Sequence, residues 1–146
     1  MTGSGANFNH SLKGTFSFRS FNGYYGWEPA VGTLTFDGEG NVSGTMDINV
    51  DGTVCTGTTL SGTYTVNSDK LTGTAALTLR NTSASCESVF PSSGTGVSLP
   101  LSLSLVRNGN GVVTLINMAE MDEGTTGTFY NTTNSIFGAV GYRTAR

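Results

Sequence analysis

Hydrophobic and polar residues alternate one by one over most of the chain, and short turn sequences rich in Gly, Asn and Asp interrupt the alternation at regular intervals. A period of two is typical of β-strands that bury one face, and such interruptions are typical of hairpin turns. The pattern is clearest over residues 97–105, where Val or Leu alternates with Ser or Pro. The chain is therefore predicted to be all-β, with at most one helical turn, over residues 118–123.

The alternation predicts eight or nine strands, at residues 12–20, 32–36, 42–50, 60–66, 71–79, 97–105, 112–118, 125–130 and 136–143. Pro100 falls inside one of them and has no N–H to donate. We therefore expect its nitrogen to face an edge or a bulge.

A recurring Gly-Thr pair between two apolar residues marks several of these strands, and its glycine falls on the apolar face. Glycine inside a strand usually marks a bend or a bulge. A sheet that coils into a closed barrel needs such bends on its inner side. The pattern favours an antiparallel up-and-down β-barrel over a flat sandwich, with the apolar face inside rather than turned to lipid. Residues 1–10 are expected to form a flexible leader and residues 11–146 a single barrel domain.

An up-and-down barrel places alternate connections at the same end. The short turns at 37–41, 67–70 and 108–111 then share one end, which we call the short-turn end. The longer connections at 20–30, 51–58, 81–96 and 119–124 share the other, the long-loop end. Cys55 and Cys86 both belong to the longer set, so they are predicted to form a disulfide; the alternative is two unpaired, buried cysteines.

Charge and composition exclude several classes of function. The net charge of −3 and the pI near 4.9 argue against nucleic acid and anionic membranes as partners. No apolar run is long enough for a spanning helix, and no phosphate loop, metal-binding motif or dinucleotide fingerprint is present, so no metal or cofactor is expected. The oligomeric state stays open. A disulfide would indicate a secreted, periplasmic or cell-envelope protein, although no signal peptide opens the chain.

The longer connections also carry the residues best suited to recognise a ligand. Aromatic rings with polar atoms beside an apolar cavity are typical of small-molecule sites. The predicted ligand-binding residues are Tyr24, Tyr25, Trp27, Glu28 and Phe90, with Glu28 or Glu87 as polar anchor. The alternative is that Tyr24, Tyr25 and Trp27 plug the barrel mouth. The acidic residues Glu120, Asp122 and Glu123 lack the spacing of a calcium loop and are expected to be solvated.

Three functions remain open at this point. The first is a binding module for a small apolar or aromatic molecule. The second is a cofactor-free cyclase or isomerase, in which Glu28 or Glu87 pairs with Tyr24 for acid–base chemistry. The third is a structural or adhesive surface domain. The sole histidine, His10, precedes the first strand and belongs to the short-turn end, which weakens any Ser-His or Cys-His mechanism.

Three of the strand starts resemble those of calycin-type barrels, the lipocalin and avidin superfamily: Leu12-Lys-Gly-Thr-Phe16, Val42-Ser-Gly-Thr-Met46 and Leu60-Ser-Gly-Thr-Tyr64. The architecture is also similar to that of allene oxide cyclase. The resemblance implies a small-molecule barrel in which an Arg from a late strand, here Arg143, packs near the residue at position 16. These families usually have Trp where Phe16 stands, and biotin binders use several tryptophans where this chain has only Trp27.

Overall fold

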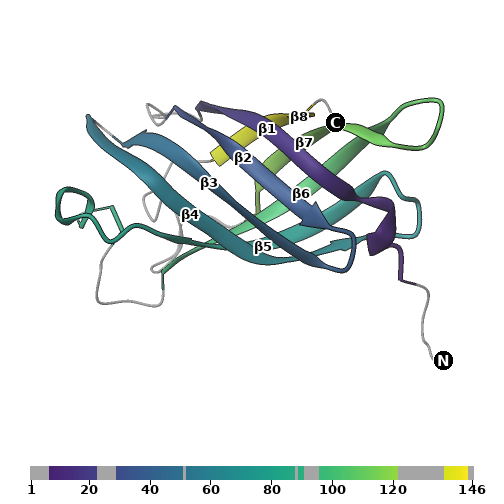
Figure 1. The fold of residues 1–146 in the computed structure, drawn as a ribbon, viewed down its shortest axis with the longest axis horizontal. Helices are drawn as coiled ribbons and strands as arrows, with labels where there is room; N and C mark the ends of the chain where they lie inside the picture. The colour runs from purple at the N-terminus through teal and green to yellow at the C-terminus, as the bar shows by residue number, and fades with distance from the viewer. Residues whose placement is uncertain are drawn as a thin grey trace.

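The structure is a computed structural model, and it describes residues 7–22, 29–50, 52–87, 89–90, 96–121 and 137–144. Eight antiparallel strands form a closed barrel in which each strand pairs with the next and the last pairs with the first (Figure 1). The strands are β1 (Lys13–Asn22), β2 (Ala30–Asp37), β3 (Asn41–Val50), β4 (Thr53–Val66), β5 (Thr72–Arg80), β6 (Val97–Arg107), β7 (Val113–Glu120) and β8 (Phe137–Arg143).

The predicted up-and-down barrel is confirmed, with eight strands in the described part of the chain. The strand expected at 125–130 lies outside the described residues. The helical turn expected from Met118 is wrong where it can be seen, because β7 continues to Glu120. The helices of the described ranges are two short 3₁₀ turns, η1 (Asn9–Ser11) and η2 (Ala84–Cys86). None of them is long enough to cross a membrane.

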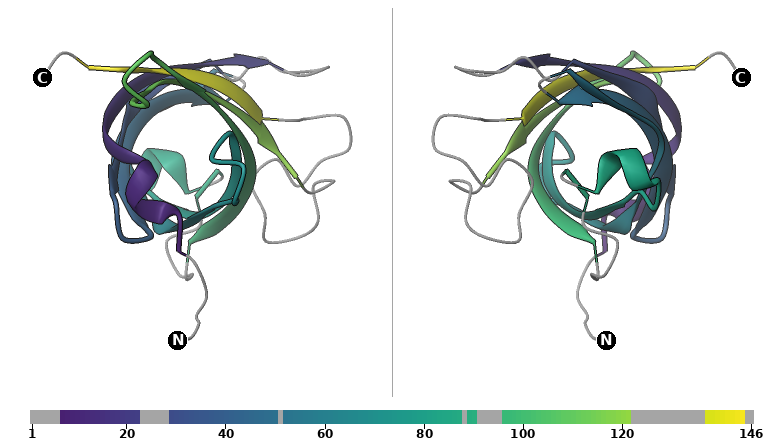
Figure 2. Two further views of the ribbon diagram at one scale, coloured as in Figure 1. Left: turned by 90° about the vertical axis from the view of Figure 1, so that its right-hand side faces the viewer. Right: turned by 90° about the vertical axis from the view of Figure 1, so that its left-hand side faces the viewer.

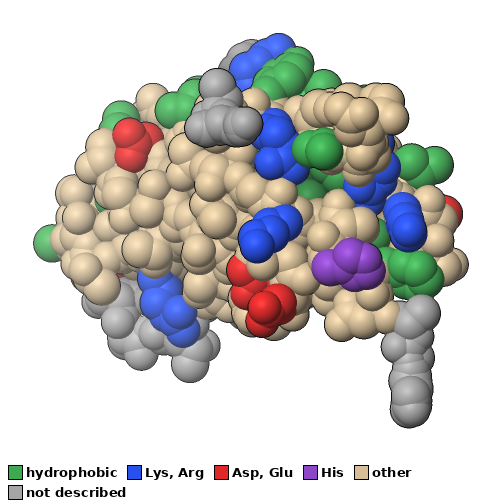
Figure 3. Space-filling view, turned by 45° about the vertical axis from the view of Figure 1, so that its right-hand side comes forward, with side chains coloured by type: hydrophobic (Ala, Val, Ile, Leu, Met, Phe, Trp, Pro, Cys, Tyr) green, Lys and Arg blue, Asp and Glu red, His purple; other side chains and the backbone are tan. Residues whose placement is uncertain are grey.

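The apolar face of each strand points into the barrel, as predicted. On β6, Leu99 and Leu103 are almost completely buried, and the Ser residues between the apolar positions are exposed. Most of the face shown in Figure 3 carries neither charged nor hydrophobic side chains. Leu71, the first residue of the strand predicted at 71–79, is half-exposed, because it lies in the turn before β5 begins.

Glycines on the inner face let neighbouring strands approach closely. A Cβ atom at Gly44 would collide with the carbonyl oxygen of Thr33 on β2, and one at Gly62 would collide with that of Ala76 on β5. Only glycine fits such a contact between backbones. These glycines therefore mark positions where neighbouring strands approach too closely for any side chain.

The expected long connection at 51–58 is wrong, because β4 already begins at Thr53. The alternation is broken there by a β-bulge: Met46 pairs with Thr58, but Ile48 pairs with Cys55, which leaves one extra residue on β4. Gly57 supplies the left-handed conformation (φ +67°) that such a bulge needs, and its N–H donates to Asp47 Oδ1 at 2.8 Å. The extra residue changes which positions of β4 point into the barrel. An alternation counted back from the residues after Thr58 therefore assigns the residues before it to the wrong face.

Pro100 stands in a closed barrel rather than on an edge strand. Its carbonyl oxygen accepts a hydrogen bond from the N–H of Met121 at 2.9 Å, so its nitrogen also faces the β7 side. The register of β6 with β7 starts one residue later, at the pair of Leu101 with Glu120. The N–H that Pro100 lacks would therefore lie at the end of the hydrogen-bond ladder between β6 and β7. This position is neither the edge nor the bulge that we expected.

The turn η1 closes the short-turn end, and η2 lies at the opposite end (Figure 2). Asn9 Oδ1 accepts a hydrogen bond from the N–H of Val66 at 2.8 Å, and the guanidinium of Arg107 donates to the carbonyl oxygen of Ser11 at 2.9 Å. Two residues of the expected leader are thus attached to the barrel, because Phe8 packs against the core and Asn9 is hydrogen-bonded to β4; residues 1–6 lie outside the described residues.

Candidate functional site

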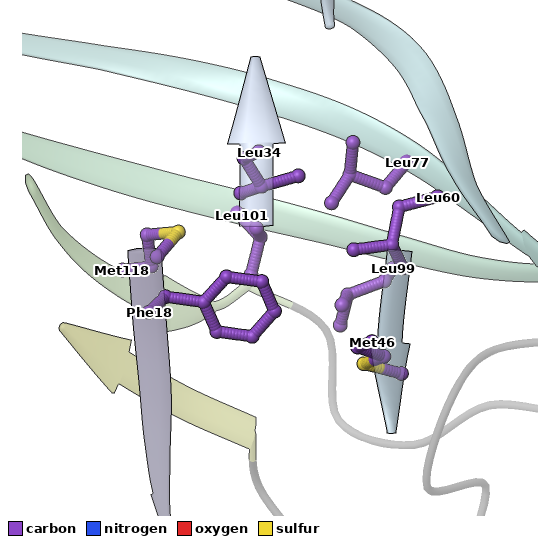
Figure 4. A pocket seen from close by; sticks show the side chains of 8 residues that line it. All are labelled: Phe18, Leu34, Met46, Leu60, Leu77, Leu99, Leu101 and Met118. Carbon is purple, nitrogen blue, oxygen red and sulfur yellow. The ribbon is translucent and has the colours of Figure 1, made fainter. Parts of the chain in front are cut away.

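An apolar cavity lies halfway along the barrel interior (Figure 4). Its volume is about 10 Å³, which is room for roughly one water-sized sphere. Every lining side chain is apolar: Phe18, Leu34, Met46, Leu60, Leu77, Leu99, Leu101 and Met118. The cavity therefore offers shape and hydrophobic contact to a ligand, without a hydrogen-bonding group in its wall.

Glycines in the register of the sheet open this space. Gly32 stands between Phe18 and Met46 in one row across three strands, and Gly44 stands between Leu34 and Leu60 in the next. Each large side chain thus faces a neighbouring position with no side chain, which is how alternating large and small residues fill a tapering interior. The same glycines that allow the sheet to coil also leave the gap that the large side chains enclose.

Two of the lining residues are methionines, Met46 on β3 and Met118 on β7, and both are buried. Methionine is unbranched and has three rotatable bonds, so it adapts to an irregular space more easily than Leu or Phe does. This part of the wall is the most able to change shape around a guest molecule.

The long-loop end is closed by η2 and the residues that follow it, which we call the stopper (residues 84–87 and 89–90). Figure 2 shows η2 across the opening of the barrel. Cys86 and Phe90 are both buried in the common hydrophobic core, and the N–H of Phe90 donates to the carbonyl oxygen of Cys86 at 2.7 Å. Phe90, which we expected to contact a ligand, therefore packs into the core at this end of the barrel.

The predicted disulfide between Cys55 and Cys86 is confirmed, and it ties the stopper to β4. Their Cα atoms are 5.8 Å apart, although the residues are 31 positions apart in sequence. Two buried polar residues strengthen the attachment: the side-chain amide of Asn81 donates to Thr58 Oγ1 at 2.9 Å and to the carbonyl oxygen of Thr56 at 3.0 Å. The stopper is thus held by the disulfide, and the residue Asn81, which precedes it, is held to β4 by hydrogen bonds.

The other predicted site residues are distributed as follows. Tyr24, Tyr25, Trp27 and Glu28 lie outside the described residues, so their roles stay predictions. Glu87, the other expected polar anchor, is exposed on the stopper.

Glu120 is a residue whose position sequence reasoning missed. We expected it in a solvated loop, but it is the last residue of β7 and is half-buried. It is in phase with Ile116 and Met118, both buried inside, and it pairs with Leu101, which lines the cavity. Continuing the alternation of β7 by two residues would have placed it on the inner face.

The short-turn end holds a second organised group, around Tyr64 and Phe16. The Tyr64 hydroxyl accepts a hydrogen bond from the N–H of Gly38 at 2.8 Å and donates to the carbonyl oxygen of Leu12 at 2.7 Å. Burial raises the pKa of this phenol above its usual value. Arg143 lies over the ring of Phe16 at 4.9 Å, the packing that the resemblance to lipocalins implied.

No group of three or more His, Cys, Asp or Glu within the described ranges is arranged to hold a metal ion. His10 lies in η1 at the short-turn end and is exposed, far along the barrel from the stopper.

No protein-family model and no curated protein matches the chain. Three solved structures do, and all are designed β-barrels. A redesigned barrel bound to DFHBI matches with a TM-score of 0.55 and 16% identity, over 94% of this chain and 100% of its own. A fluorescence-activating barrel designed de novo matches with a TM-score of 0.54 and 12% identity, over 96% of this chain and 100% of its own.

A further redesigned barrel matches with a TM-score of 0.58 and 15% identity, over 97% of this chain and 99% of its own. At such low identities the similarity establishes the fold: a small, closed, antiparallel β-barrel of eight strands. It does not assign the chain to the calycin superfamily.

Proposed function

We propose that the protein binds a small apolar or aromatic molecule inside the barrel, at the cavity between Phe18, Met46 and Met118. The observation that carries the proposal is the cavity wall, in which all eight side chains are apolar and two are adaptable methionines. Burial of apolar surface is the main source of affinity in such a site, at about 25 cal/mol per Å².

The cavity must enlarge to hold such a ligand. Typical small-molecule sites measure about 300–1,000 Å³, against about 10 Å³ here. Rotation of the Met46 and Met118 side chains would enlarge the cavity. Displacement of Phe90 would open a path to the cavity from the long-loop end. Binding therefore selects or induces a more open state of the interior.

Two further observations support a binding barrel. The similar redesigned barrel holds DFHBI, a small aromatic dye, so a barrel of this architecture can accept such a ligand. The disulfide between Cys55 and Cys86 is typical of proteins of oxidising compartments, which agrees with a secreted or cell-envelope binding protein.

The test uses the methionine methyl groups as reporters. We expect the methyl resonances of Met46 and Met118 to shift on titration with DFHBI in a protein labelled with ¹³C at the methionine methyls. Met121 is half-exposed on the surface and serves as the internal control. Shifts at Met121 alone, or at none of the three at saturating ligand, would exclude the proposed site.

A structural or adhesive surface domain is the second candidate, and the close packing of the interior favours it. It would be the better conclusion if Met46 and Met118 stay unmoved. No observation favours the cyclase or isomerase, since Glu87 is exposed and both Glu28 and Tyr24 lie outside the described residues.

A further inference from the structure

We infer that Gly141 on β8 is a specificity-determining residue of the cavity, because it leaves room beside Phe18 and Met118 and so sets the size of the ligand that the barrel accepts. The inference rests on the proposed function and adds a limit on ligand size. It follows from a comparison of Gly141 with the other glycines on the inner face of the barrel.

Gly141 lies on the inner face, next to the cavity wall. Its register partners are Phe18 on β1 and Ile116 on β7, and both are buried inside the barrel. Phe18 lines the cavity, and so does Met118, two residues after Ile116 on the same face of β7. A side chain at position 141 would therefore point into the interior beside these two lining residues.

The fold itself accounts for the other inner-face glycines of the described strands. A Cβ atom would collide with a backbone carbonyl oxygen of the neighbouring strand at Gly32, Gly44, Gly62 and Gly73. Gly14 has a positive φ of +136°, and a Cβ atom there would collide with the guanidinium of Arg143. At all of these positions an adjacent group of the protein occupies the space of the missing side chain.

Gly141 meets no such obstacle. A Cβ atom there would lie 3.4 Å from Phe18 Cβ, 3.6 Å from Met118 Cε and 3.6 Å from Phe16 Cβ, which are ordinary van der Waals distances. These three nearest atoms all belong to side chains, and the φ of Gly141 is not positive. Alanine would therefore fit without strain, and glycine weakens a strand relative to alanine.

Glycine inside a strand marks a bend, a bulge, or a position where another backbone or a ligand approaches closely. Since no neighbouring backbone explains Gly141, the close approach of a ligand is the remaining role. The room that it leaves is about one methyl group deep and adjoins the adaptable side chain of Met118. When Met118 turns aside, an apolar ligand reaches the backbone of Gly141.

The experiment narrows this room by one methyl group, in Gly141→Ala, and compares two neutral ligands of different size, benzene and indole. Dissociation constants come from titrations that follow the methyl resonances of Met46 and Met118. One methylene group in an apolar pocket is worth about tenfold or more in binding. We therefore expect indole to bind Gly141→Ala about tenfold more weakly than the wild type, and the smaller benzene to lose less than about threefold.

Urea unfolding separates the room for a ligand from a requirement of the fold. Gly141→Ala should unfold at the same urea concentration as the wild type or a higher one, because alanine lowers the conformational entropy of the unfolded chain. Gly44→Ala should unfold at a lower concentration, because its methyl group collides with the carbonyl oxygen of Thr33.

Two further variants complete the comparison. Gly109→Ala adds the same methyl group in an exposed turn with nothing within 4 Å, and it should bind both ligands as the wild type does. The double variant Gly141→Ala, Met118→Ala removes a side chain that the added methyl group would touch. It should recover indole binding, followed at Met46, if the loss in the single variant is a loss of space.

The outcomes separate the inference from the proposed function. If the wild type binds indole and Gly141→Ala binds it equally well, or loses both ligands to the same degree, Gly141 does not set ligand size, although the proposed function stands. A fall in the urea midpoint of Gly141→Ala as large as that of Gly44→Ala would likewise overturn the inference, since the fold would then require this glycine. If neither ligand moves the Met46 and Met118 resonances of the wild type, the proposed function fails, and the inference fails with it.

Discussion

The guanidinium of Arg143 lies 4.9 Å from the centre of the Phe16 ring, at the short-turn end of the barrel. Its Nε donates to the carbonyl oxygen of Val113 at 2.6 Å, and its Nη2 donates to that of Lys13 at 2.8 Å. One side chain of β8 thus binds the backbone at the starts of both neighbouring strands, β7 and β1. Because β8 closes the barrel against β1, this residue secures the closure.

Replacement of Arg143 should therefore destabilise the barrel even when the charge is kept. In Arg143→Lys the ammonium cannot stack over the ring and reach both carbonyl oxygens, because it lacks the planar fork of the guanidinium. We expect a loss of about 1–3 kcal/mol of unfolding free energy in urea. The matched variant Arg19→Lys, on the exposed face of β1, should change it by less than about 0.5 kcal/mol; equal losses in the two would contradict the role of Arg143.

The Tyr64 hydroxyl links three segments that are distant in sequence: η1, the turn after β2, and β4. In Tyr64→Phe the buried N–H of Gly38 loses its acceptor and the carbonyl oxygen of Leu12 loses its donor. An unsatisfied buried polar group costs about 1–3 kcal/mol, and we expect a loss of that size in urea unfolding. Tyr142→Phe removes a hydroxyl from a half-exposed ring on β8 and is expected to be neutral.

The same tyrosine predicts how stability responds to high pH. Burial raises the pKa of the Tyr64 phenol, so the folded protein keeps this proton at a pH where the unfolded chain has lost it. The unfolded state then binds fewer protons, and the unfolding free energy falls as pH rises from about 10 through the folded pKa. Below that range the contribution is complete.

The stability advantage of the wild type over Tyr64→Phe should therefore shrink above about pH 10, in urea titrations at a series of pH values. A constant difference across that range would show that Tyr64 ionises in the folded protein as it does in the unfolded chain.

The disulfide should contribute substantially to stability. It joins Cys55 to Cys86 across 31 positions, and the chain-entropy relation gives about 3–4 kcal/mol for a loop of that length. We expect the double variant Cys55→Ala, Cys86→Ala to lose about that amount in guanidinium unfolding. A dithiol reductant should lower the stability of the wild type and leave the double variant unchanged. An equal effect on both proteins would show that the reductant does not act through this disulfide.

Glycine at position 44 should be replaceable only at a cost. In Gly44→Ala the new methyl group would overlap the carbonyl oxygen of Thr33, a backbone atom that cannot move aside without separating β2 from β3. Overpacking of this kind costs about 1–3 kcal/mol or more. Gly109→Ala, in the turn between β6 and β7, has nothing within 4 Å of the new atom and should unfold at nearly the wild-type urea concentration.

The class of fold was predictable because it depends on a local property, the alternation of apolar and polar side chains. The errors occurred where one residue interrupts that alternation or where a strand continues into charged sequence. The bulge at Gly57 hid the first part of β4, and an acidic cluster hid the end of β7 at Glu120. Neither signal is strong, because a bulge adds a single residue and a carboxylate on an inner face is rare.

The sequence alone determined that the chain forms an antiparallel barrel with its apolar face inside, and that Cys55 and Cys86 meet at one end. Both follow from the period of the pattern and from the geometry of a meander. Only the tertiary structure decided how full the barrel is and which polar groups reach its interior. The first depends on register, that is, on which glycine faces which Leu or Met across three strands. The second depends on how far each strand continues, as β7 does to Glu120. The alternation along one strand gives the face of each residue, but it does not by itself identify the residue that lies opposite.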